Sequence, residues 1–419
     1  MRLKDISILS PRFAGRTSDD TVAFVPMESL REDAIDQKEI SVAEGSSKYT
    51  YFADNDLLIA KVTPCFENGN IAVAKDLKGG FGFGSSEIFV LRFNKQTNPR
   101  YMFYLAESSP FQDKACATMC GVGGLKRISP LFMRTYEAEF PSLKEQDAIV
   151  AYLDKQINSI NERICLRERE LQTLIKLKQS EINSVITNGL TPGVPMKDSG
   201  IDWMGAIPVH WHTIRLKDVS YLYGGLTGKA GDDFRCDDPS QTKPFIPFTN
   251  ILNNTIVDFS NFKQVVMSDG EDQNRVHEND ILFLMSSEDY ESIGKTAIVL
   301  GDPGEVYLNS FCRGLRFTNM KDVFPKFVNY LLISDKYRDA LRFEARGFTR
   351  INLKIDKIAS LSIALPPIEE QKAIVEYLDG KYERIDAFIA NINAQIDKLK
   401  LLKKALINEV VTGQRPIAQ

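Results

Sequence analysis

The sequence predicts an α+β protein in which two similar globular domains alternate with two long α-helices. Three observations support this prediction. Residues 141–187 align without a gap onto residues 366–412, both copies carry apolar residues at heptad spacing, and the segments before them share weaker repeats. A repeat of this period is too long for a solenoid unit and contains a whole domain with its helix. We therefore expect a pseudo-twofold molecule with a globular domain at 1–139, a long helix at 140–190, a connector at 191–212, a second globular domain at 213–364, and a second long helix with the tail at 365–419.

The repeat continues into the globular domains through short matched runs. Arg2–Ser7 resembles Arg215–Ser220, Asn55–Leu58 resembles Asn279–Leu282, and Leu91–Phe93 resembles Leu315–Phe317. Runs of β-type residues between turn residues predict strands. These strands are expected at Asp56–Val62, Ile71–Lys75, Ile88–Phe93, Asp280–Met285, Thr296–Leu300 and Gly314–Phe317, and one helix is expected in each domain, at about Pro99–Thr118 and Pro325–Arg346. The glycine-rich run Gly80–Gly84 is expected to be a turn.

The two repeat copies predict long helices with a coiled-coil seam. Apolar residues step by four and three along each copy, and helix-breaking residues lie mainly outside them. The predicted core of the helix pair is Leu153, Ile157, Ile160, Ile164, Leu171 and Leu174 in the first copy and Leu378, Tyr382, Ile385, Ile389, Ile392, Ile396 and Leu399 in the second. In the first copy, Arg167, Lys178 and Glu181 interrupt this seam.

An apolar stripe on a single helix needs a partner. The natural partner is the other copy in the same chain, which pairs antiparallel about a pseudo-twofold axis to form an intramolecular coiled coil. The alternative is a coiled coil between two separate chains. The intervening domain is long enough to let the chain return, and the high local concentration favours the intramolecular pair.

Composition narrows the class of protein. The apolar runs are too short to span a membrane, and the first residues lack the apolar segment of a secretory signal, so we expect a cytoplasmic protein. Six cysteines are too few for a disulfide scaffold in a chain of 419 residues. The three histidines form no convincing metal site, and His210-Trp211-His212 is expected to serve packing.

The charge does not indicate nucleic-acid binding, because the formal net charge is −4. Basic residues nevertheless recur every four positions at Arg338, Arg342, Arg346, Arg350 and Lys354. We expect the helix to end near Gly347 and a loop to follow, and Gly121–Arg127 holds the matching place in the first domain. Two basic, glycine-containing loops can present cations to phosphates and base edges. The alternative is a solvated charged face.

Sequence motifs for catalysis are missing. The chain has no Asn/Asp-Pro-Pro-aromatic segment, which an adenine methyltransferase needs to hold its base, and no phosphate-binding loop of the P-loop type. The sequence also suggests no nucleophile–histidine arrangement. We therefore expect no enzymatic activity in this chain.

The chain resembles the specificity subunit of type I restriction–modification enzymes. The resemblance rests on a motif that occurs twice, a proline followed by Glu-Gln at the start of a long helix. The two copies are Pro141 with Glu145-Gln146 and Pro366 with Glu370-Gln371. Each copy is followed by the run Ala-Ile-Val-x-Tyr-Leu-Asp. The connector segment Asp198–Trp211 is similar to the usual entry into the family's second target recognition domain.

The resemblance implies a non-catalytic DNA-recognition subunit in which each domain reads one half of a split, asymmetric target. The helices would set the spacing between the half-sites and dock two methyltransferase subunits, with restriction subunits joining through the complex. No cofactor is expected on this chain, since S-adenosylmethionine, ATP and magnesium would belong to the partners. From loop position and residue type we predict DNA contacts at Arg12, Arg16, Lys61, Lys126, Arg127, Thr227, Lys229, Arg346, Thr349, Arg350 and Lys354.

Two other functions compete with this one. A stand-alone DNA-modifying enzyme would methylate DNA without partners, and a coiled-coil scaffold would bind duplexes without regard to sequence. The sequence does not identify the bases read, the spacer length, or the domain that reads each half-site.

Overall fold

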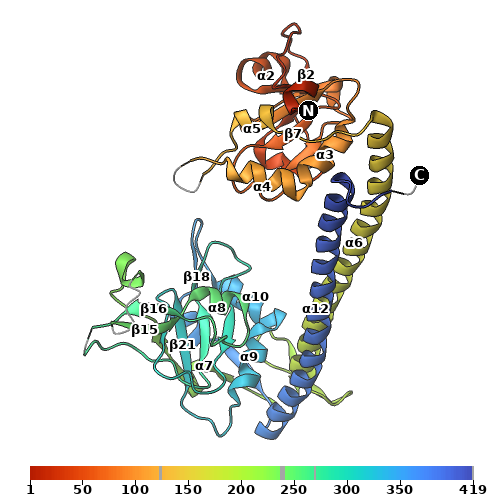
Figure 1. Cartoon of the computed structure of the whole chain (residues 1–419). Coiled ribbons are helices and arrows are strands. Elements are labelled where there is room, and N and C mark those ends of the chain that lie inside the picture. The colour runs from red at the N-terminus through yellow and green to blue at the C-terminus, as the bar shows by residue number, and fades with distance from the viewer. Residues whose placement is uncertain (122–124, 236–240, 269, 418–419) are drawn as a thin grey trace. The chain divides into compact units, whose positions relative to one another are not determined.

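The computed structural model describes residues 1–121, 125–235, 241–268 and 270–417. It divides into two compact units, Met1–Arg169 with Ile392–Gln419, and Glu170–Asn391. Each unit combines one globular domain with a part of both long helices, which are labelled α6 and α12 in Figure 1. No helix in these described ranges is both long and apolar enough to cross a membrane.

The described part of the first unit contains two four-stranded sheets and a small two-stranded one. The first sheet has the order β1 (Ser7–Leu9), β10 (Ile88–Phe93), β7 (Leu57–Ala60), β8 (Ile71–Val73). The second has the order β5 (Lys38–Ser41), β2 (Thr21–Val25), β9 (Phe81–Gly84), β6 (Thr50–Ala53). The small sheet joins β3 (Leu30–Arg31) and β4 (Ala34–Ile35). The helices of this domain are α1 (Leu3–Ile6), α2 (Val42–Lys48), α3 (Pro99–Glu107), α4 (Ser109–Ala117) and α5 (Pro130–Thr135).

The second unit repeats this plan. Its main sheet has the order β14 (Ser220–Gly224), β21 (Cys312–Phe317), β17 (Ile281–Leu284), β19 (Thr296–Ile298), and its second sheet has the order β16 (Lys263–Val266), β15 (Thr242–Ile246), β20 (Tyr307–Leu308). Three further strand pairs are β13 (His212–Arg215) with β23 (Ser362–Leu365), β11 (Met196–Asp198) with β12 (Ala206–Pro208), and β18 (Ser286–Ser287) with β22 (Ile351–Asn352). The helices are α7 (Leu216–Val219), α8 (Phe248–Asn253), α9 (Pro325–Ile333), α10 (Asp335–Glu344) and α11 (Ile355–Ala359).

The two main sheets pair their strands in the same way. Leu91 lies opposite Leu57 in the first domain, and Leu315 lies opposite Ile281 in the second. Both second sheets are mixed, because β2 runs parallel to β9 and β15 runs parallel to β20. The prediction of two α+β domains with the same fold is therefore confirmed.

The repeated Asn-Asp pair before β7 and β17 has a physical reason. Asn55 and Asn279 adopt positive φ angles of 70° and 69°, a backbone region that asparagine tolerates better than most residues. The following carboxylates, on Asp56 and Asp280, are each 1% exposed. Each carboxylate forms an ion pair with the arginine of the repeated Leu-Arg-Phe run. Asp56 pairs with Arg92 at 2.6 Å, and Asp280 pairs with Arg316 at 2.7 Å. The sequence repeat thus preserves a turn and a buried ion pair.

Two local predictions were wrong. Each domain has a broken helix pair where one continuous helix was expected, because Ser108 and Ser334 take extended backbone angles. Their hydroxyls donate to the carbonyls of Leu105 and Leu331 at 2.7 and 2.6 Å, so these serines end the first helix of each pair.

The run Gly80–Gly84 is the other correction, because residues from Phe81 onward form strand β9 and not a turn. A Cβ atom on Gly82 would lie 2.6 Å from the carbonyl oxygen of Ala23 on the neighbouring strand. Glycine is needed here for the close approach of strands, which a reading based on turn propensity misses.

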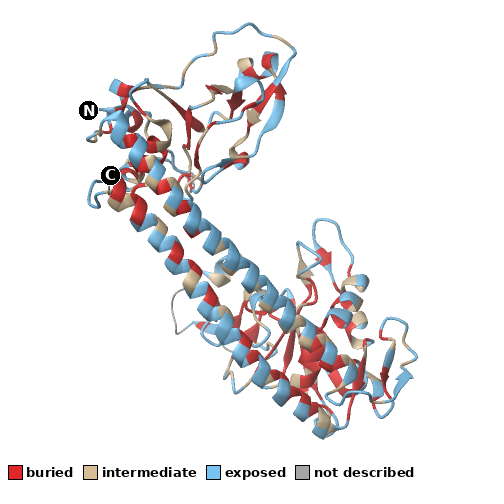
Figure 2. Cartoon of the chain, turned by 90° about the vertical axis from the view of Figure 1, so that its right-hand side faces the viewer, coloured by how far each residue is buried: buried red, intermediate tan, exposed pale blue. Residues whose placement is uncertain are grey.

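The predicted long helices are α6 (Leu143–Asn188, 46 residues) and α12 (Ile368–Val411, 44 residues). In the second unit, Lys178 binds Asp386 at 2.7 Å, while Glu181, one turn further along α6, binds Lys381, which lies earlier in α12. The two helices therefore run antiparallel there. In the first unit, Ile149 and Leu153 share one buried cluster with Leu406 and Val410. Figure 2 shows the buried residues in the sheets and along the helix faces that meet.

The connector is more regular than expected, because β11 and β12 form a hairpin inside it. Trp211 is buried, and its indole N–H donates to Glu370 at 3.2 Å. His210 contacts the other oxygen of the same carboxylate at 2.7 Å. The expected packing role is therefore confirmed for Trp211, whereas His210 and His212 are exposed.

Candidate nucleic-acid interface

Each globular domain carries a hairpin at an equivalent place. In the second domain, Arg346 and Asn352 exchange two backbone hydrogen bonds of 3.0 and 2.8 Å. In the first domain, Cys120 and Arg127 exchange two of 3.1 and 2.9 Å. Both hairpins follow the helix pair of their domain along the chain. The first hairpin forms hydrogen bonds with Thr63, just after β7, and the second pairs with Ser286, just after β17. The expectation of matched basic loops therefore has a structural counterpart, and residues 122–124 of the predicted first loop lie outside the described residues.

The second hairpin presents most of the predicted contact residues of its domain. Arg346, Thr349 and Arg350 are exposed on it, and Lys354 is exposed just beyond it. The guanidinium of Arg350 lies 4.4 Å from the centre of the Phe311 ring, and that of Arg346 lies 5.9 Å from that of Phe343. Both arginines therefore stack on aromatic rings and leave hydrogen-bond donors for a ligand.

The basic residues that recur every four positions do not form one stripe on a helix, and the helix ends slightly before the end predicted near Gly347. α10 ends at Glu344, so Arg346, Arg350 and Lys354 lie outside it. Arg338 is buried, and Arg342 forms an ion pair with Glu291. The backbone leaves the helix before the stripe is complete, which changes the direction of each later side chain.

Thr227 and Lys229 lie on a different loop of the second domain, after β14. The ammonium of Lys229 binds Glu271 at 2.6 Å, and its side chain is 9% exposed. Hydrogen bonds, first of all from Lys229, lower the pKa of Glu271 to about 2. Thr227 is exposed, and its backbone N–H donates to Gln273. Lys229 is thus held by a carboxylate, unlike Arg350.

Three of the predicted residues of the first domain lie close together, and one of them binds a carboxylate. Arg127 binds Glu87 at 2.8 Å, and the backbone N–H of Lys61 donates to the carbonyl of Glu87. The ammonium of Lys61 donates to the Ser86 carbonyl at 2.6 Å, and burial lowers its pKa. Lys126 is exposed beside them. Arg12 and Arg16 are exposed on a separate loop between β1 and β2.

A small cavity of about 210 Å³ lies beside the second hairpin. Its polar lining includes Ser286, Ser287, Glu288, Asp289 and Arg350, and its apolar lining includes Phe311. Hydroxyls, carboxylates and a guanidinium are the groups that discriminate base edges. This combination could not be found from the sequence, because its members come from three segments of the chain that are separated by 22 and 39 residues.

Sequence reasoning also missed exposed aromatic residues of this region. Phe348, at the turn of the second hairpin, is 99% exposed, and Phe343 is 75% exposed. A signal was present, since Phe348 stands between two arginines in a glycine-containing loop.

The predicted helix-pair core divides into buried and half-buried positions. The half-buried ones are Ile164, Leu171, Leu174 and Ile389, and the buried ones are Leu153, Ile157, Ile160, Leu378, Tyr382, Ile385, Ile392, Ile396 and Leu399. The interruption at Lys178 is accommodated by its bond to Asp386 and by the Tyr382 ring, 4.3 Å from the ammonium. Glu181 accepts a hydrogen bond from the Tyr377 hydroxyl.

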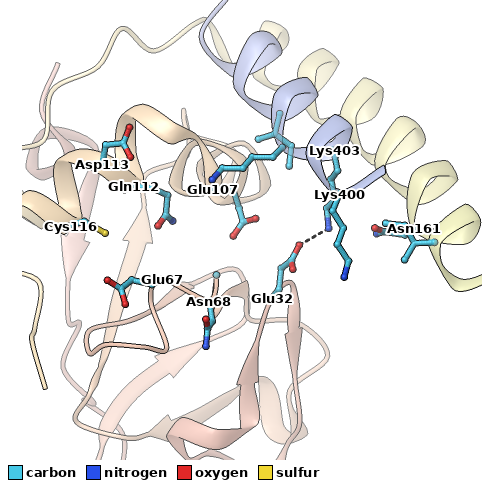
Figure 3. Close-up of a pocket in the computed structure, with 14 residues that line it drawn as sticks. Glu32, Glu67, Asn68, Glu107, Gln112, Asp113, Cys116, Asn161, Lys400 and Lys403 are labelled. Carbon is cyan, nitrogen blue, oxygen red and sulfur yellow. Dashed lines mark hydrogen bonds and ion pairs between the residues drawn. The ribbon is translucent and has the colours of Figure 1, made fainter. Parts of the chain in front are cut away.

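A larger cavity, of about 570 Å³, lies within the first unit between the domain and the helices (Figure 3). Its domain side carries Glu32, Glu67, Glu107 and Asp113, and α12 contributes Lys400, Lys403 and Lys404. Lys403 binds Glu32 at 2.5 Å. Burial, followed by the charge of Glu32, raises the pKa of Glu107 to about 8. The cavity therefore holds charged groups at a junction of domain and helix.

The second unit has a corresponding cavity of about 400 Å³. Lys178, which aligns with Lys403 in the repeat, lines it, and the domain side carries both basic and acidic groups, namely Lys295, Arg338, Arg342, Glu291 and Asp335. Across the residues that the structure describes, no group of three or more His, Cys, Asp or Glu side chains could hold a metal ion. The exposed hairpins thus remain the best candidates for ligand binding.

Comparisons with known proteins point to one family. Residues 208–398 match the family model described as the type I restriction modification DNA specificity domain. The type I restriction enzyme EcoEI specificity subunit of Escherichia coli is 34% identical over 157 residues, which are 36% of this chain and 26% of that protein. The EcoAI specificity subunit of Escherichia coli is 28% identical over 222 residues, which are 52% of this chain and 37% of that protein. The matches thus span between about a quarter and two fifths of these two curated relatives.

One solved structure supports the fold over the whole length. It comes from work on complex assembly and conformational transition of the type I R-M system, and it matches with a TM-score of 0.71. The match covers 99% of this chain and 97% of that chain at 18% sequence identity. At this identity the likeness shows the shared fold alone.

Proposed function

We propose that this chain belongs to the type I restriction–modification specificity family, whose model matches residues 208–398, and is the non-catalytic DNA-recognition subunit of such a complex. One observation carries the proposal. Two domains of the same fold present hairpins at equivalent places, and the exposed side chains on those hairpins differ. Such an arrangement suits the reading of two different half-sites, one by each domain, so the target is asymmetric.

The long helices set the spacing between half-sites in this proposal. At 1.5 Å per residue, helices of 46 and 44 residues are about 65 to 70 Å long, roughly twice the ~34 Å of one duplex turn. Globular domains attached to helices of this length can bind half-sites separated by about one duplex turn. Helix length then determines the number of unread base pairs.

The same helices offer docking surfaces to two methyltransferase subunits. α6 and α12 expose large apolar side chains away from their shared seam, namely Leu166, Ile175, Leu177, Phe388, Leu401 and Leu402. Exposed apolar residues at several points of a helix pair are suited to protein partners. Those partners would supply S-adenosylmethionine, and restriction subunits would join the complex with ATP and magnesium. The complex would act on double-stranded DNA in the cytoplasm.

The test is methylation mapping in a host without other modification systems. The chain is produced together with its methyltransferase partner, and the modified positions of the host DNA are sequenced. The expected result is one split, asymmetric motif with a fixed spacer, which disappears when this chain is omitted. Methylation by the purified chain alone would support an enzyme, and unchanged methylation without the chain would support a scaffold; either result would overturn the proposal.

A further inference from the structure

Phe348 has an unusual position for a large apolar side chain. It is 99% exposed, so folding leaves its ring in water. Single exposed apolar residues are common on protein surfaces, and exposure alone therefore decides nothing. The setting of this ring is more informative, because it stands at the turn of a hairpin between Arg346 and Arg350.

The hairpin that carries Phe348 is held in place by several contacts. Arg346 and Asn352 close it with two backbone hydrogen bonds, and β22 pairs with β18. Gly347 adopts a φ of 148°, and a Cβ atom there would lie 2.0 Å from the carbonyl oxygen of Arg350. The hydroxyl of Tyr290 also donates to the Gly347 carbonyl at 3.3 Å. The backbone that carries the ring is therefore ordered before binding, which reduces the conformational entropy lost by the hairpin when it binds.

The charge around the ring favours a polyanion. Within the described ranges, neither Arg346 nor Arg350 forms an ion pair with a carboxylate, whereas Arg127 on the hairpin of the first domain is paired with Glu87. Two guanidiniums flanking an exposed ring combine phosphate contacts with a flat apolar surface. Proteins that kink duplexes insert such apolar wedges between base pairs while cations hold the backbone.

We propose that Phe348 inserts between two adjacent base pairs of double-stranded DNA at the half-site of the second domain. Arg346 and Arg350 contact the phosphates on either side of the opened step. This inference rests on the proposed function, since it assumes that the second domain binds DNA. The opened step brings neighbouring base edges, and not phosphates, toward the cavity lined by Ser286, Ser287, Arg350 and the carboxylates of Glu288 and Asp289.

The experiment uses the complete complex of this chain with its methyltransferase partner and duplexes that contain the motif found by methylation mapping. 2-Aminopurine, whose fluorescence rises when it is unstacked, replaces one base at each position of the half-site in turn. Wild-type complex is expected to raise the fluorescence at a single step. Phe348→Ala removes the rise and weakens binding of the target roughly tenfold, in line with stacking energies measured for aromatic side chains. Phe348→Trp retains both properties.

Controls separate this inference from the proposed function. Phe348→Ala is expected to fold normally, because the ring contributes no burial to the free protein. Phe259→Ala, another exposed aromatic change in the second domain, leaves the fluorescence unchanged. Specific binding by the wild-type complex without any rise in fluorescence would contradict the insertion of Phe348 and would leave the proposed function unaffected. Loss of complex assembly in Phe348→Ala would overturn it in favour of a protein contact. No specific binding by wild type would contradict the proposed function itself.

Discussion

Gln146 and Gln371 make the same contacts at the starts of the two long helices. The Gln146 side chain accepts a hydrogen bond from the Asn98 N–H and donates one to the Pro141 carbonyl, both at 2.8 Å. Gln371 accepts from the Phe324 N–H and donates to the carbonyls of Pro366 and Asp322, all at 2.8 Å. Each glutamine therefore ties a long helix to the start of a helix in its domain, which explains why the proline–glutamine spacing occurs twice.

Removing either side chain should destabilise the unit that contains it. Gln371→Ala removes the partner of the buried Pro366 carbonyl and of two half-buried groups, the Phe324 N–H and the Asp322 carbonyl. It should cost about 2 to 4 kcal/mol, and Gln146→Ala should cost somewhat less, because it leaves fewer groups. Calorimetric melting of both variants measures the effect. Gln172→Ala, an exposed change on α6, is the matched control. Melting temperatures equal to wild type for both variants would show that water replaces these contacts without penalty.

The parts of the fold that could be predicted are those encoded locally. The heptad seam from Leu378 to Leu399 depends on residue spacing, and the strand Ile88–Phe93 depends on a run of β-type residues, so local patterns predicted both. The breaks at Ser108 and Ser334 depend on one backbone dihedral angle each, in helices that otherwise have continuous helical patterns. Periodicity does not contain that information.

The candidate interface was less predictable for a similar reason. The sequence predicted both Lys229 and Arg350 as DNA contacts and did not distinguish between them. Their difference comes from Glu271, which lies 42 residues beyond Lys229, and from Phe311, which lies 39 residues before Arg350. Residue type and loop position cannot show which cation is neutralised by a distant partner, and they cannot show that Phe348 is exposed.

These different environments predict different effects of two charge removals. Arg350→Ala should weaken DNA binding by the complex and reduce the slope of log affinity against log salt concentration by about one, because one phosphate contact is lost. Lys229→Ala should change DNA binding less and should lower stability, because Glu271 loses its partner. Binding titrations over a salt series, together with melting curves, measure both. Equal salt slopes for Arg350→Ala and wild type would remove Arg350 from the interface.

Glu107 predicts a dependence of stability on pH. Its pKa of about 8 in the folded protein exceeds the ordinary value of 4.5, so the folded protein binds this proton more tightly than the unfolded chain. Below about pH 4.5 the carboxyl is protonated in both states and does not lower the free energy of unfolding. Above that pH it lowers the free energy of unfolding increasingly, until the pH passes about 8. Glu107→Gln should accordingly stabilise the protein by about 3 to 5 kcal/mol at pH 9 and have little effect at pH 4.5.

Melting curves of Glu107→Gln and wild type at both pH values test this expectation. Glu67→Gln, an exposed carboxyl on the same cavity, controls for the loss of one negative charge. A difference in melting temperature between Glu107→Gln and wild type that stays constant from pH 4.5 to pH 9 would mean that Glu107 does not titrate in this range.

The proposed spacing role of the helices predicts the effect of a heptad deletion. Removing Ile164–Glu170 from α6 shortens one helix by about 10 Å and keeps the seam in register on both sides of the deletion. The shortened helix no longer matches α12, so the preferred number of base pairs between half-sites should decrease, or methylation should be lost. Methylation mapping with the deleted chain measures the spacer directly. Deleting the aligned residues 389–395 of α12 as well restores equal helix lengths and should recover methylation at a shorter spacer. An unchanged spacer in both variants would show that helix length does not set the distance, while the half-site sequences would still report recognition by the two domains.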